Sequence, residues 1–266
     1  MTLEQCRQNL VAVLDRNAEL AIAVSGGVDS MVLTYIAHRF SKAEVTAIHA
    51  VSPAVPTVAT ERVEAHARRH GWSLRLIDAG ELRDPAYRAN PVNRCFYCKT
   101  NLYDSIRAVT AVPIASGTNV DDLSDFRPGL AAARDRNVLH PFVEAGVRKA
   151  EIYALAAAHG LNDLAALPAQ PCLASRIETG IGVDAQSLQF IERVEGELLA
   201  LLPAASAIRC RITPAGIQVE CSPLPQGEDR ARSEERVREL CAEAGRPLAG
   251  FRPYQRGSAF LRDVAG

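Results

Sequence analysis

The chemistry-bearing residues with the clearest spacing form a short glycine turn near the N-terminus. The turn consists of Ser25, Gly26, Gly27, Val28, Asp29 and Ser30. An apolar run over 20–24 precedes it and another over 31–37 follows it, which is the pattern of a strand, a tight turn and a helix. Two adjacent glycines let the backbone approach a ligand closely, and the free N–H groups at a helix start attract anions. The turn is therefore expected to bind phosphate.

This turn differs from two familiar glycine-rich nucleotide motifs. No Gly-Lys-Ser/Thr follows it, as a Walker A loop requires, and the Gly-x-Gly-x-x-Gly spacing of a dinucleotide fingerprint is absent. Its SGGxDS pattern resembles the pyrophosphate loop (PP-loop) of the ATP pyrophosphatase superfamily, whose members cleave ATP to AMP and pyrophosphate. The alternative is an ordinary glycine-rich turn between a strand and a helix.

A second group of residues capable of chemistry is a pair of thiols. Cys95 and Cys98 have the Cys-x-x-Cys spacing that lets two thiolates share one metal or cluster. A single such pair leaves three interpretations open: part of a metal or cluster site, a thioredoxin-like redox motif, or two packed cysteines at a helix start.

A third thiol, Cys172, lies in the segment PCLASR. Arg176, four residues later, could stabilise a thiolate or a substrate anion, because a nearby cation lowers the pKa of a thiol. Taken alone, Cys172 is more typical of a buried structural cysteine. With Cys95 and Cys98 it makes three thiols, which is enough for a [4Fe–4S] cluster with one iron left open. The remaining cysteines have no partner spacing and are expected to be structural: Cys6, Cys210, Cys221 and Cys241.

These residues need elements that position them, and the first part of the chain alternates apolar strands with amphipathic helices. Strands are expected over 20–24, 44–51, 73–78, 112–116 and 138–141. Repeated strand–helix units predict an α/β fold, a Rossmann-like parallel sheet flanked by helices. Ligands of such sheets bind at the carboxyl ends of the strands, and the glycine turn lies at one of these ends.

The pattern changes after residue 167, where a proline-rich loop leads into Cys172. Two short apolar segments, 207–212 and 217–221, flank a Pro-Ala-Gly turn and predict a hairpin. We expect a PP-loop domain over 1–179 and a smaller α+β domain over 180–266.

The composition is that of an ordinary globular chain. Its 266 residues are 48% hydrophobic and 23% charged, and the net charge of −1 gives no bulk attraction to nucleic acid or membrane. The first residues lack a signal-peptide pattern, and no apolar run is long enough for a transmembrane helix. Seven cysteines without a secretion signal favour thiol or metal chemistry over disulfides, so we expect a cytoplasmic location.

Five motifs in a fixed order resemble the LarE family of ATP-dependent sulfurtransferases, which help to build the nickel-pincer nucleotide of lactate racemase. They are SGGVDS (25–30), NRCFYCK (93–99), SGTNVDD (116–122), DFRPG (125–129) and PCLASRI (171–177). The resemblance covers nearly the whole chain. It implies that ATP adenylates the carboxylates of pyridinium-3,5-biscarboxylic acid mononucleotide, which become thiocarboxylates. It also implies a homo-oligomer that acts on a small nucleotide, with no nucleic-acid partner expected.

The resemblance assigns roles to the residues singled out above. The turn over 25–30 would bind ATP, with Asp29 on Mg²⁺ because this ion prefers carboxylate and phosphate oxygens. The Cys172 thiolate would displace AMP, and cleavage of its Cβ–S bond would leave dehydroalanine. Family members that also carry a Cys-x-x-Cys pair resemble cluster-dependent tRNA thiolation enzymes, in which an open iron holds exogenous sulfide. Cys95 and Cys98 place this chain in the second group, so a [4Fe–4S] cluster with Cys172 is favoured over the sacrifice of Cys172.

Polar residues after the fourth predicted strand are expected to contact the nucleotide. Thr118 and Asn119 end that strand near the expected crevice. Asp125 and Arg127, a few residues later, would orient the substrate. The alternative for this group is a capping and turn cluster.

Arginines of the smaller domain are expected to bind the anionic groups of the substrate. Arg209 and Arg211 alternate on one predicted strand and therefore share a face, where paired guanidiniums suit phosphate or carboxylates. Arg256 would join them, and Glu197 is a weaker candidate for the same site. A solvated strand face is the alternative.

Two other classes of function compete with this interpretation. The first is another PP-loop enzyme, such as a tRNA thiolase or an amide ligase similar to NAD synthetase; the near-neutral charge argues against a tRNA substrate. The second is a nucleotide- or metal-binding module without enzymatic activity.

Overall fold

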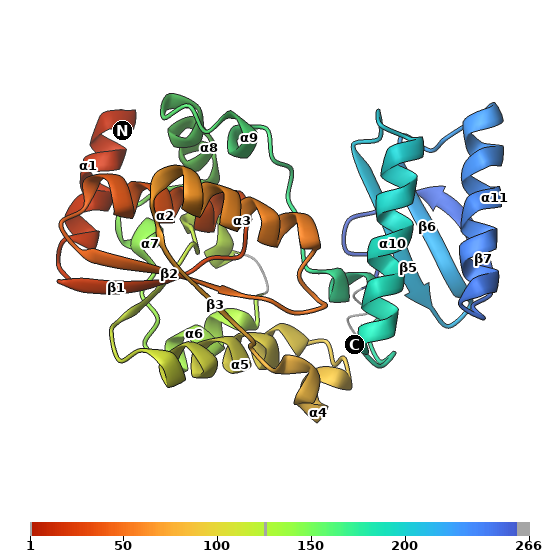
Figure 1. The fold of residues 1–266 in the computed structure, drawn as a ribbon, viewed down its shortest axis with the longest axis horizontal. Helices are drawn as coiled ribbons and strands as arrows, with labels where there is room; N and C mark the ends of the chain where they lie inside the picture. The colour runs from red at the N-terminus through yellow and green to blue at the C-terminus, as the bar shows by residue number, and fades with distance from the viewer. Residues whose placement is uncertain (1, 125–126, 260–266) are drawn as a thin grey trace. The chain divides into compact units, whose positions relative to one another are not determined.

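The computed structural model describes residues 2–124 and 127–259 (Figure 1). It divides into two compact units, one made of Met1–Glu81 and Cys95–Gln170, the other of Leu82–Arg94 and Pro171–Gly266. The second unit therefore begins earlier than residue 180, where the sequence analysis places the boundary, and it includes a segment from the middle of the first domain.

The first unit is built on a parallel sheet of four strands. They are β1 (Glu19–Ala23), β2 (Glu44–Ala50), β3 (Ser73–Ile77) and β4 (Ile114–Ser116). Their order across the sheet is β3-β2-β1-β4, and every pairing is parallel. The α/β class and the parallel sheet predicted from the strand–helix alternation are confirmed in this unit.

Helices cover both faces of this sheet. Those of the first unit are α1 (Leu3–Leu14), α2 (Val28–Phe40), α3 (Thr57–His70), α5 (Arg94–Val109), α6 (Gly129–Asp135), α7 (Pro141–Glu144), α8 (Lys149–Ala158) and α9 (Asn162–Ala165), with short 3₁₀ turns at Glu81–Arg83 and Val120–Ser124. Figure 1 shows α2 and α3 on one face and α5 and α6 on the other. The chain changes faces because it runs outward from β1 to β3 and then returns to β4 on the opposite side of β1.

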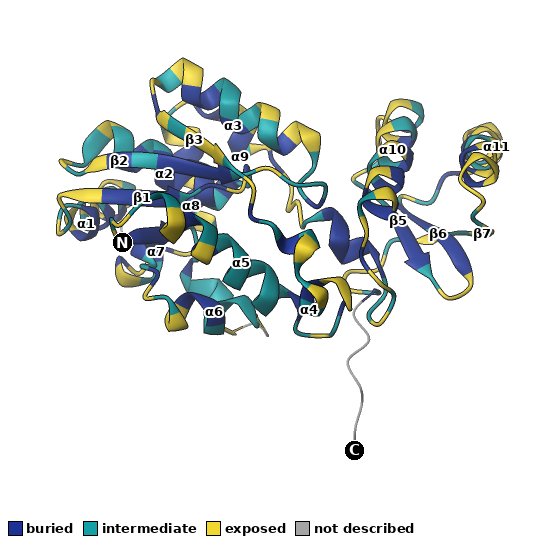
Figure 2. Ribbon diagram, turned by 60° about the horizontal axis from the view of Figure 1, so that its bottom comes forward, coloured by how far each residue is buried: buried dark blue, intermediate teal, exposed yellow. Residues whose placement is uncertain are grey.

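The core follows from strand periodicity. On β1, Leu20 and Ile22 point into the larger apolar cluster under α2 and α3, whereas Ala21 points into the smaller cluster with Tyr103 and Ile106 of α5. Successive side chains of a strand face opposite sides, so a sheet covered on both faces needs apolar residues at every position. Figure 2 shows the resulting buried band along β1 and β2.

The segment 138–141, expected to be a strand, pairs at a single position. Leu139 forms an isolated parallel bridge with Ala115, and Leu139 N donates to Ile114 O over 2.8 Å. Pro141 follows at once and begins α7. Proline has no N–H to donate to a ladder and favours a helix start, which ends the pairing.

The second unit contains a mixed sheet of three strands. β5 (Ala207–Thr213) and β6 (Gly216–Ser222) form the predicted antiparallel hairpin, and β7 (Leu248–Pro253) pairs parallel to β6. Helix α10 (Ala185–Leu201) precedes β5 and packs against it, and α11 (Gly227–Glu243) connects β6 to β7 and packs against β7. The smaller α+β region predicted for the C-terminal part is therefore present.

Asn90 ties the segment 82–94, which contains the short helix α4 (Pro85–Arg88), into the second unit. Its buried Nδ2 donates to Glu178 O over 2.8 Å and to Ile181 O over 2.9 Å. Its backbone O accepts from Gly180 N over 2.9 Å. A buried amide satisfied in this way holds the two segments together, which the local sequence does not predict.

Among the described residues, no helix has the length and apolar character needed to cross a membrane.

An aromatic cluster with several histidines lies on the α2–α3 side of the first unit. The rings of His38 and His70 stack on Trp72, each with centroids 6.1 Å apart, and Tyr35 contacts His70 edge-on. The Nε2 atoms of His38 and His70 are buried without a hydrogen-bond partner among the described residues. Burial lowers the pKa of both histidines, and the neighbouring His66 and Arg69 further lower that of His70.

These histidines predict that the first unit loses stability in mild acid. The unfolded chain takes up their protons near pH 6.5, about the ordinary value, while the folded chain resists protonation until lower pH. The free energy of unfolding therefore falls as the pH drops through this range. Urea unfolding measured between about pH 8 and pH 5 gives the free energy of unfolding at each pH. As the pH falls, this free energy should decrease less in the His38→Gln, His70→Gln double variant than in the wild type. Identical pH dependence in the two proteins would contradict this account.

Candidate functional site

The candidate site lies where the strand order of the first sheet reverses. β2 lies on one side of β1 and β4 on the other, and the chain leaves the carboxyl ends of β1 and β4 in loops on opposite sides. A crevice for ligands forms outside the strand ends at such a switch point. The segment Ser25–Ser30 leaves β1 here, and the segment 117–119 leaves β4, so the structure brings these two predicted segments together.

The turn after β1 is held by its own serines. Ser30 Oγ accepts from Ser25 N over 3.0 Å and donates to Gly27 O over 3.1 Å. Gly27 is the N-cap of α2, and none of the described side chains caps this helix start. An uncapped helix start of this kind suits an anion, and the binding of phosphate at this turn stays a prediction.

Two glycines permit close packing around the turn. Gly26 has a φ of +79°, and a Cβ there would lie 2.7 Å from Ala59 O. A Cβ at Gly117, in the loop after β4, would lie 2.7 Å from Ser30 N. Only glycine allows the two loops to approach this closely.

Asp29 is the meeting point of three segments. Its Oδ1 accepts from Asn119 Nδ2 over 3.3 Å, and its Oδ2 accepts from Lys149 Nζ over 2.6 Å. Asp29 and Asn119 were both predicted from the sequence, whereas Lys149 was not. A single lysine at a helix start has no motif around it, so no signal in the sequence identifies it.

The acidic residues after Asn119 anchor this loop. Asp121 accepts from Arg148 Nη1 and from the backbone N–H of Lys149, each over 2.8 Å. The hydrogen bond from the Lys149 N–H lowers the pKa of Asp121. Asp122 accepts from Asn119 N over 3.1 Å and pairs with Arg127 over 2.6 Å. Arg127 thus lies against the loop that carries Asn119.

Two further predictions concern the same loop. Thr118 is half-buried, and its Oγ1 lies 3.1 Å from Ser116 Oγ at the end of β4. Asp125 lies outside the described residues.

The thiols of the predicted cluster belong to different units. Cys95 and Cys98 lie one turn apart near the start of α5 in the first unit, and Cys172 belongs to the second. All three are half-buried thiols rather than disulfides. Within the described part of the chain, no three His, Cys, Asp or Glu side chains are gathered to hold a metal ion. The [4Fe–4S] cluster on these three thiols stays a prediction from the sequence.

Arg176 fixes the backbone around Cys172. Its Nη1 donates to Pro171 O over 2.6 Å and to Cys172 O over 3.0 Å, while Nε and Nη2 pair with Glu195, each over 2.9 Å. The side chain is buried. Its hydrogen bonds hold the segment that carries the thiol in place, and the role proposed for it toward a thiolate or a substrate anion stays a prediction.

Arg209 and Arg211 differ in their surroundings. Arg211 is buried and pairs with Glu220 over 2.9 Å, and Glu220 also binds Arg252. Arg209 is half-buried over the ring of Tyr254 and forms no ion pair within the described residues. Burial, with a contribution from Arg176, lowers the pKa of Arg209. Of the two arginines, Arg209 is therefore the one without an ion pair among the described residues.

Arg256, the third arginine predicted to bind the substrate anions, is exposed in the segment after β7.

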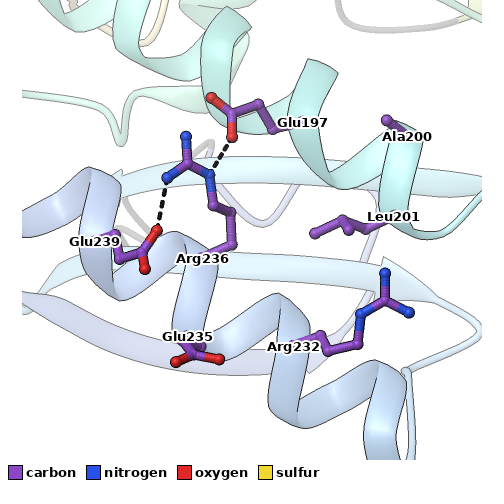
Figure 3. A pocket seen from close by; sticks show the side chains of 7 residues that line it. All are labelled: Glu197, Ala200, Leu201, Arg232, Glu235, Arg236 and Glu239. Atoms are coloured by element: carbon purple, nitrogen blue, oxygen red, sulfur yellow. Dashed lines mark hydrogen bonds and ion pairs between the residues drawn. The ribbon is translucent and has the colours of Figure 1, made fainter.

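Glu197, the weaker candidate, lies in a groove between α10 and α11 (Figure 3). This open groove has a volume of about 430 Å³. Glu197 accepts from Arg236 and pairs with Arg193 over 3.2 Å, and Arg236 also donates to Glu239 over 2.6 Å. The hydrogen bond from Arg236 lowers the pKa of Glu197. These ion pairs satisfy the carboxylate locally.

Comparison with known proteins finds relatives but no matching family model. An uncharacterized protein of Synechocystis, slr1717, is 34% identical over 197 residues, which are 73% of each chain. An uncharacterized protein of Methanocaldococcus jannaschii, MJ0830, is 25% identical over 209 residues, 77% of this chain and 79% of that protein. The pyridinium-3,5-bisthiocarboxylic acid mononucleotide synthase of Lactiplantibacillus plantarum is 26% identical over 167 residues, 61% of this chain and 60% of that protein. This distant similarity supports a LarE-like family.

The packing at Gly117 yields a direct test of the phosphate-binding turn. Gly117→Ala should push the loop after β4 away from Ser30 and lower the affinity for Mg-ATP by about tenfold, since overpacking costs about 1–3 kcal/mol. Isothermal titration calorimetry measures this change. The matched control is Gly196→Ala on α10, where a Cβ meets nothing within 4 Å. Equal ATP affinity in the two variants would show that the contact between the loops does not support binding.

Proposed function

The chain belongs to the same protein family as slr1717 of Synechocystis, and from this premise we propose that it is an ATP-dependent sulfurtransferase. Its proposed substrate is pyridinium-3,5-biscarboxylic acid mononucleotide, whose carboxylates it converts to thiocarboxylates. The observation that carries the proposal is the meeting of the phosphate-binding turn, Asn119 and Lys149 at Asp29. The similarity to the synthase of L. plantarum supports the choice of substrate.

ATP is needed because a carboxylate is a poor electrophile. Its leaving group would be oxide, whereas transfer of AMP to the carboxylate oxygen creates a good leaving group. Pyrophosphate departs in that step, and its negative charge must be stabilised. In this chain, the uncapped start of α2 and the Lys149 ammonium are the groups that would stabilise the negative charge of pyrophosphate.

The residues fit a magnesium ion at the turn. Mg²⁺ is usually bound in proteins by one or two carboxylates together with substrate phosphates, and Asp29 supplies one carboxylate that is 28% exposed. When bound, Mg²⁺ would neutralise phosphate charge. Asp29 would hold it, and Lys149 would then be released to face the phosphates.

Cys172 is the proposed sulfur nucleophile. Its thiolate attacks the adenylated carboxyl carbon, forms a thioester and releases AMP. Removal of the Cα proton then drives cleavage of the Cβ–S bond, and the C–S electron pair leaves with the thiocarboxylate. Dehydroalanine remains in the protein, so each chain reacts once. Arg176 contributes by holding the backbone around this thiol.

A second source of sulfur is proposed for the same reaction. An exogenous sulfide bound to a [4Fe–4S] cluster on Cys95, Cys98 and Cys172 would spare the protein. Because the pair Cys95 and Cys98 belongs to one unit and Cys172 to the other, we derive no step through the cluster. The Cys-x-x-Cys pair is the observation that favours this source, and it also favours a cluster-dependent tRNA thiolase as the second candidate function.

Arg209 is the proposed contact for an anionic group of the substrate. Its guanidinium forms no ion pair with a carboxylate among the described residues. Arg256 is proposed to assist it. A homo-oligomer and the absence of a nucleic-acid partner stay predictions from the sequence.

The mass of the protein after turnover tests the source of the sulfur. Anaerobic protein is incubated with Mg-ATP, sulfide and the biscarboxylated pyridinium mononucleotide, and product and intact protein are measured by mass spectrometry. Loss of one H₂S from Cys172 for each thiocarboxylate indicates sacrifice, and Cys95→Ser should then keep full activity. An unchanged mass together with loss of activity in Cys95→Ser indicates the cluster. Thiolated product from Cys172→Ser would refute both routes.

Lys149 predicts a separate effect on nucleotide binding. Lys149→Met removes a cation beside Asp29, so the affinity for Mg-ATP should fall about tenfold, the effect of losing a hydrogen bond to a charged group. The control is Lys42→Met, since Lys42 is exposed before the amino end of β2. Calorimetric titration compares the two variants, and equal affinities would remove Lys149 from the site.

A further inference from the structure

Arg62, from the middle of α3, joins two segments of the first unit that are far apart in the sequence. Its Nη1 donates to Gly26 O in the phosphate-binding turn over 2.7 Å and to Gln170 Oε1 over 3.0 Å. Gln170 is the last residue of the first unit and precedes Cys172 by two positions. One nitrogen atom thus contacts both the turn and the segment that leads to the thiol.

The contact with Gly26 determines the direction of a backbone donor. A trans peptide is planar, so the carbonyl of Gly26 and the N–H of Gly27 point in opposite directions. By holding the carbonyl, Arg62 turns the Gly27 N–H to the other side, where Ser25 Oγ lies 3.4 Å away. Gly26 has a φ of +79°, and glycine has little intrinsic preference for one orientation of the peptide that follows it. A hydrogen bond from Arg62 can therefore determine this orientation.

The charge of Arg62 is placed to respond to an anion in the turn. Arg62 is half-buried and forms no ion pair with a carboxylate within residues 2–124 and 127–259. The nearby Asp163 is engaged by His66 Nε2 over 2.6 Å. Burial lowers the pKa of Arg62, yet a guanidinium stays protonated in proteins. A phosphate bound at the turn would supply the missing negative charge and strengthen the hold on Gly26.

The segment after residue 167 can transmit a change at Gln170. Pro168 and Pro171 flank this residue, and each fixes its own φ. Arg176 in turn holds the carbonyls of Pro171 and Cys172. A restraint on the side chain of Gln170 therefore restricts a short, stiff stretch of backbone that ends at the reactive thiol.

We propose that Arg62 is a positioning residue that couples pyrophosphate in the turn to the segment carrying Cys172. Bound pyrophosphate strengthens the hydrogen bond from Arg62 to Gly26 and also the hydrogen bond from the same nitrogen to Gln170. Release of pyrophosphate weakens both hydrogen bonds. This coupling is reciprocal, as any linkage between two binding equilibria must be. The proposal rests on the proposed function, because it concerns the pyrophosphate formed at that site.

The test measures the reactivity of Cys172 as pyrophosphate is added. Iodoacetamide labels the thiol, and peptide mass spectrometry gives the labelling rate with and without Mg-pyrophosphate, whose affinity is measured by calorimetry. In the wild type, saturating pyrophosphate should slow the labelling of Cys172 about fivefold, a typical lower bound for coupled sites. Gln170→Ala should lose this protection and, because the coupling is reciprocal, bind pyrophosphate up to about fivefold more weakly. Arg62→Gln should lose the protection and bind pyrophosphate about fivefold more weakly.

Control variants separate positioning from folding. Arg69→Gln removes an exposed arginine from the same helix and should behave as wild type. Arg62→Lys keeps the charge and should retain more of the pyrophosphate affinity than Arg62→Gln. Full protection of Cys172 in Gln170→Ala, or no protection in a wild type that binds pyrophosphate, would overturn the coupling and leave the proposed function standing. A wild type that does not bind Mg-pyrophosphate would overturn both.

Discussion

Three segments that are far apart in the chain meet at the carboxylate of Asp29. Asp29 follows β1, Asn119 follows β4, and Lys149 begins α8. The side-chain amide of Asn119 lies 3.3 Å from the carboxylate of Asp29, and the ammonium of Lys149 lies 2.6 Å from it. The reversal of strand order brings the first two together, and the hydrogen bonds of Asp121 with Arg148 and Lys149 hold the start of α8 beside them. We propose that this partly exposed carboxylate exchanges the Lys149 ammonium for a metal ion when phosphates bind, because all of these interactions are electrostatic.

The sequence was sufficient for the elements whose signals are local. The turn over 25–30, the parallel strands beside it and the hairpin over 207–221 each follow from glycine placement or apolar periodicity. Lys149 and Arg62 could not be predicted, because each acts through a partner that only the folded chain brings near. The same reason explains the segment 138–141, where an apolar run gives a single bridge because a proline helix start follows directly.

The second unit shows how ion pairing distinguishes similar arginines. Alternation placed Arg209 and Arg211 on one strand face, but their roles depend on carboxylates from other elements. Glu220 on the neighbouring strand neutralises Arg211, and Glu195 on α10 neutralises Arg176. A buried guanidinium needs such a partner, since leaving a buried charge unpaired is costly. Among these three arginines, Arg209, half-buried beside Tyr254, is the one without an ion pair in the described part of the chain, and we propose that a ligand anion pairs with it.

We propose that the turn at the carboxyl end of β1 serves an adenylating enzyme. The position of bond cleavage in ATP tests it most directly, and ³¹P NMR of the reaction with the biscarboxylated pyridinium mononucleotide reports it. The account predicts AMP and pyrophosphate, formed only when this substrate is present and lost in Asp29→Asn. Formation of ADP and phosphate, or AMP formation that does not depend on the substrate, would contradict it.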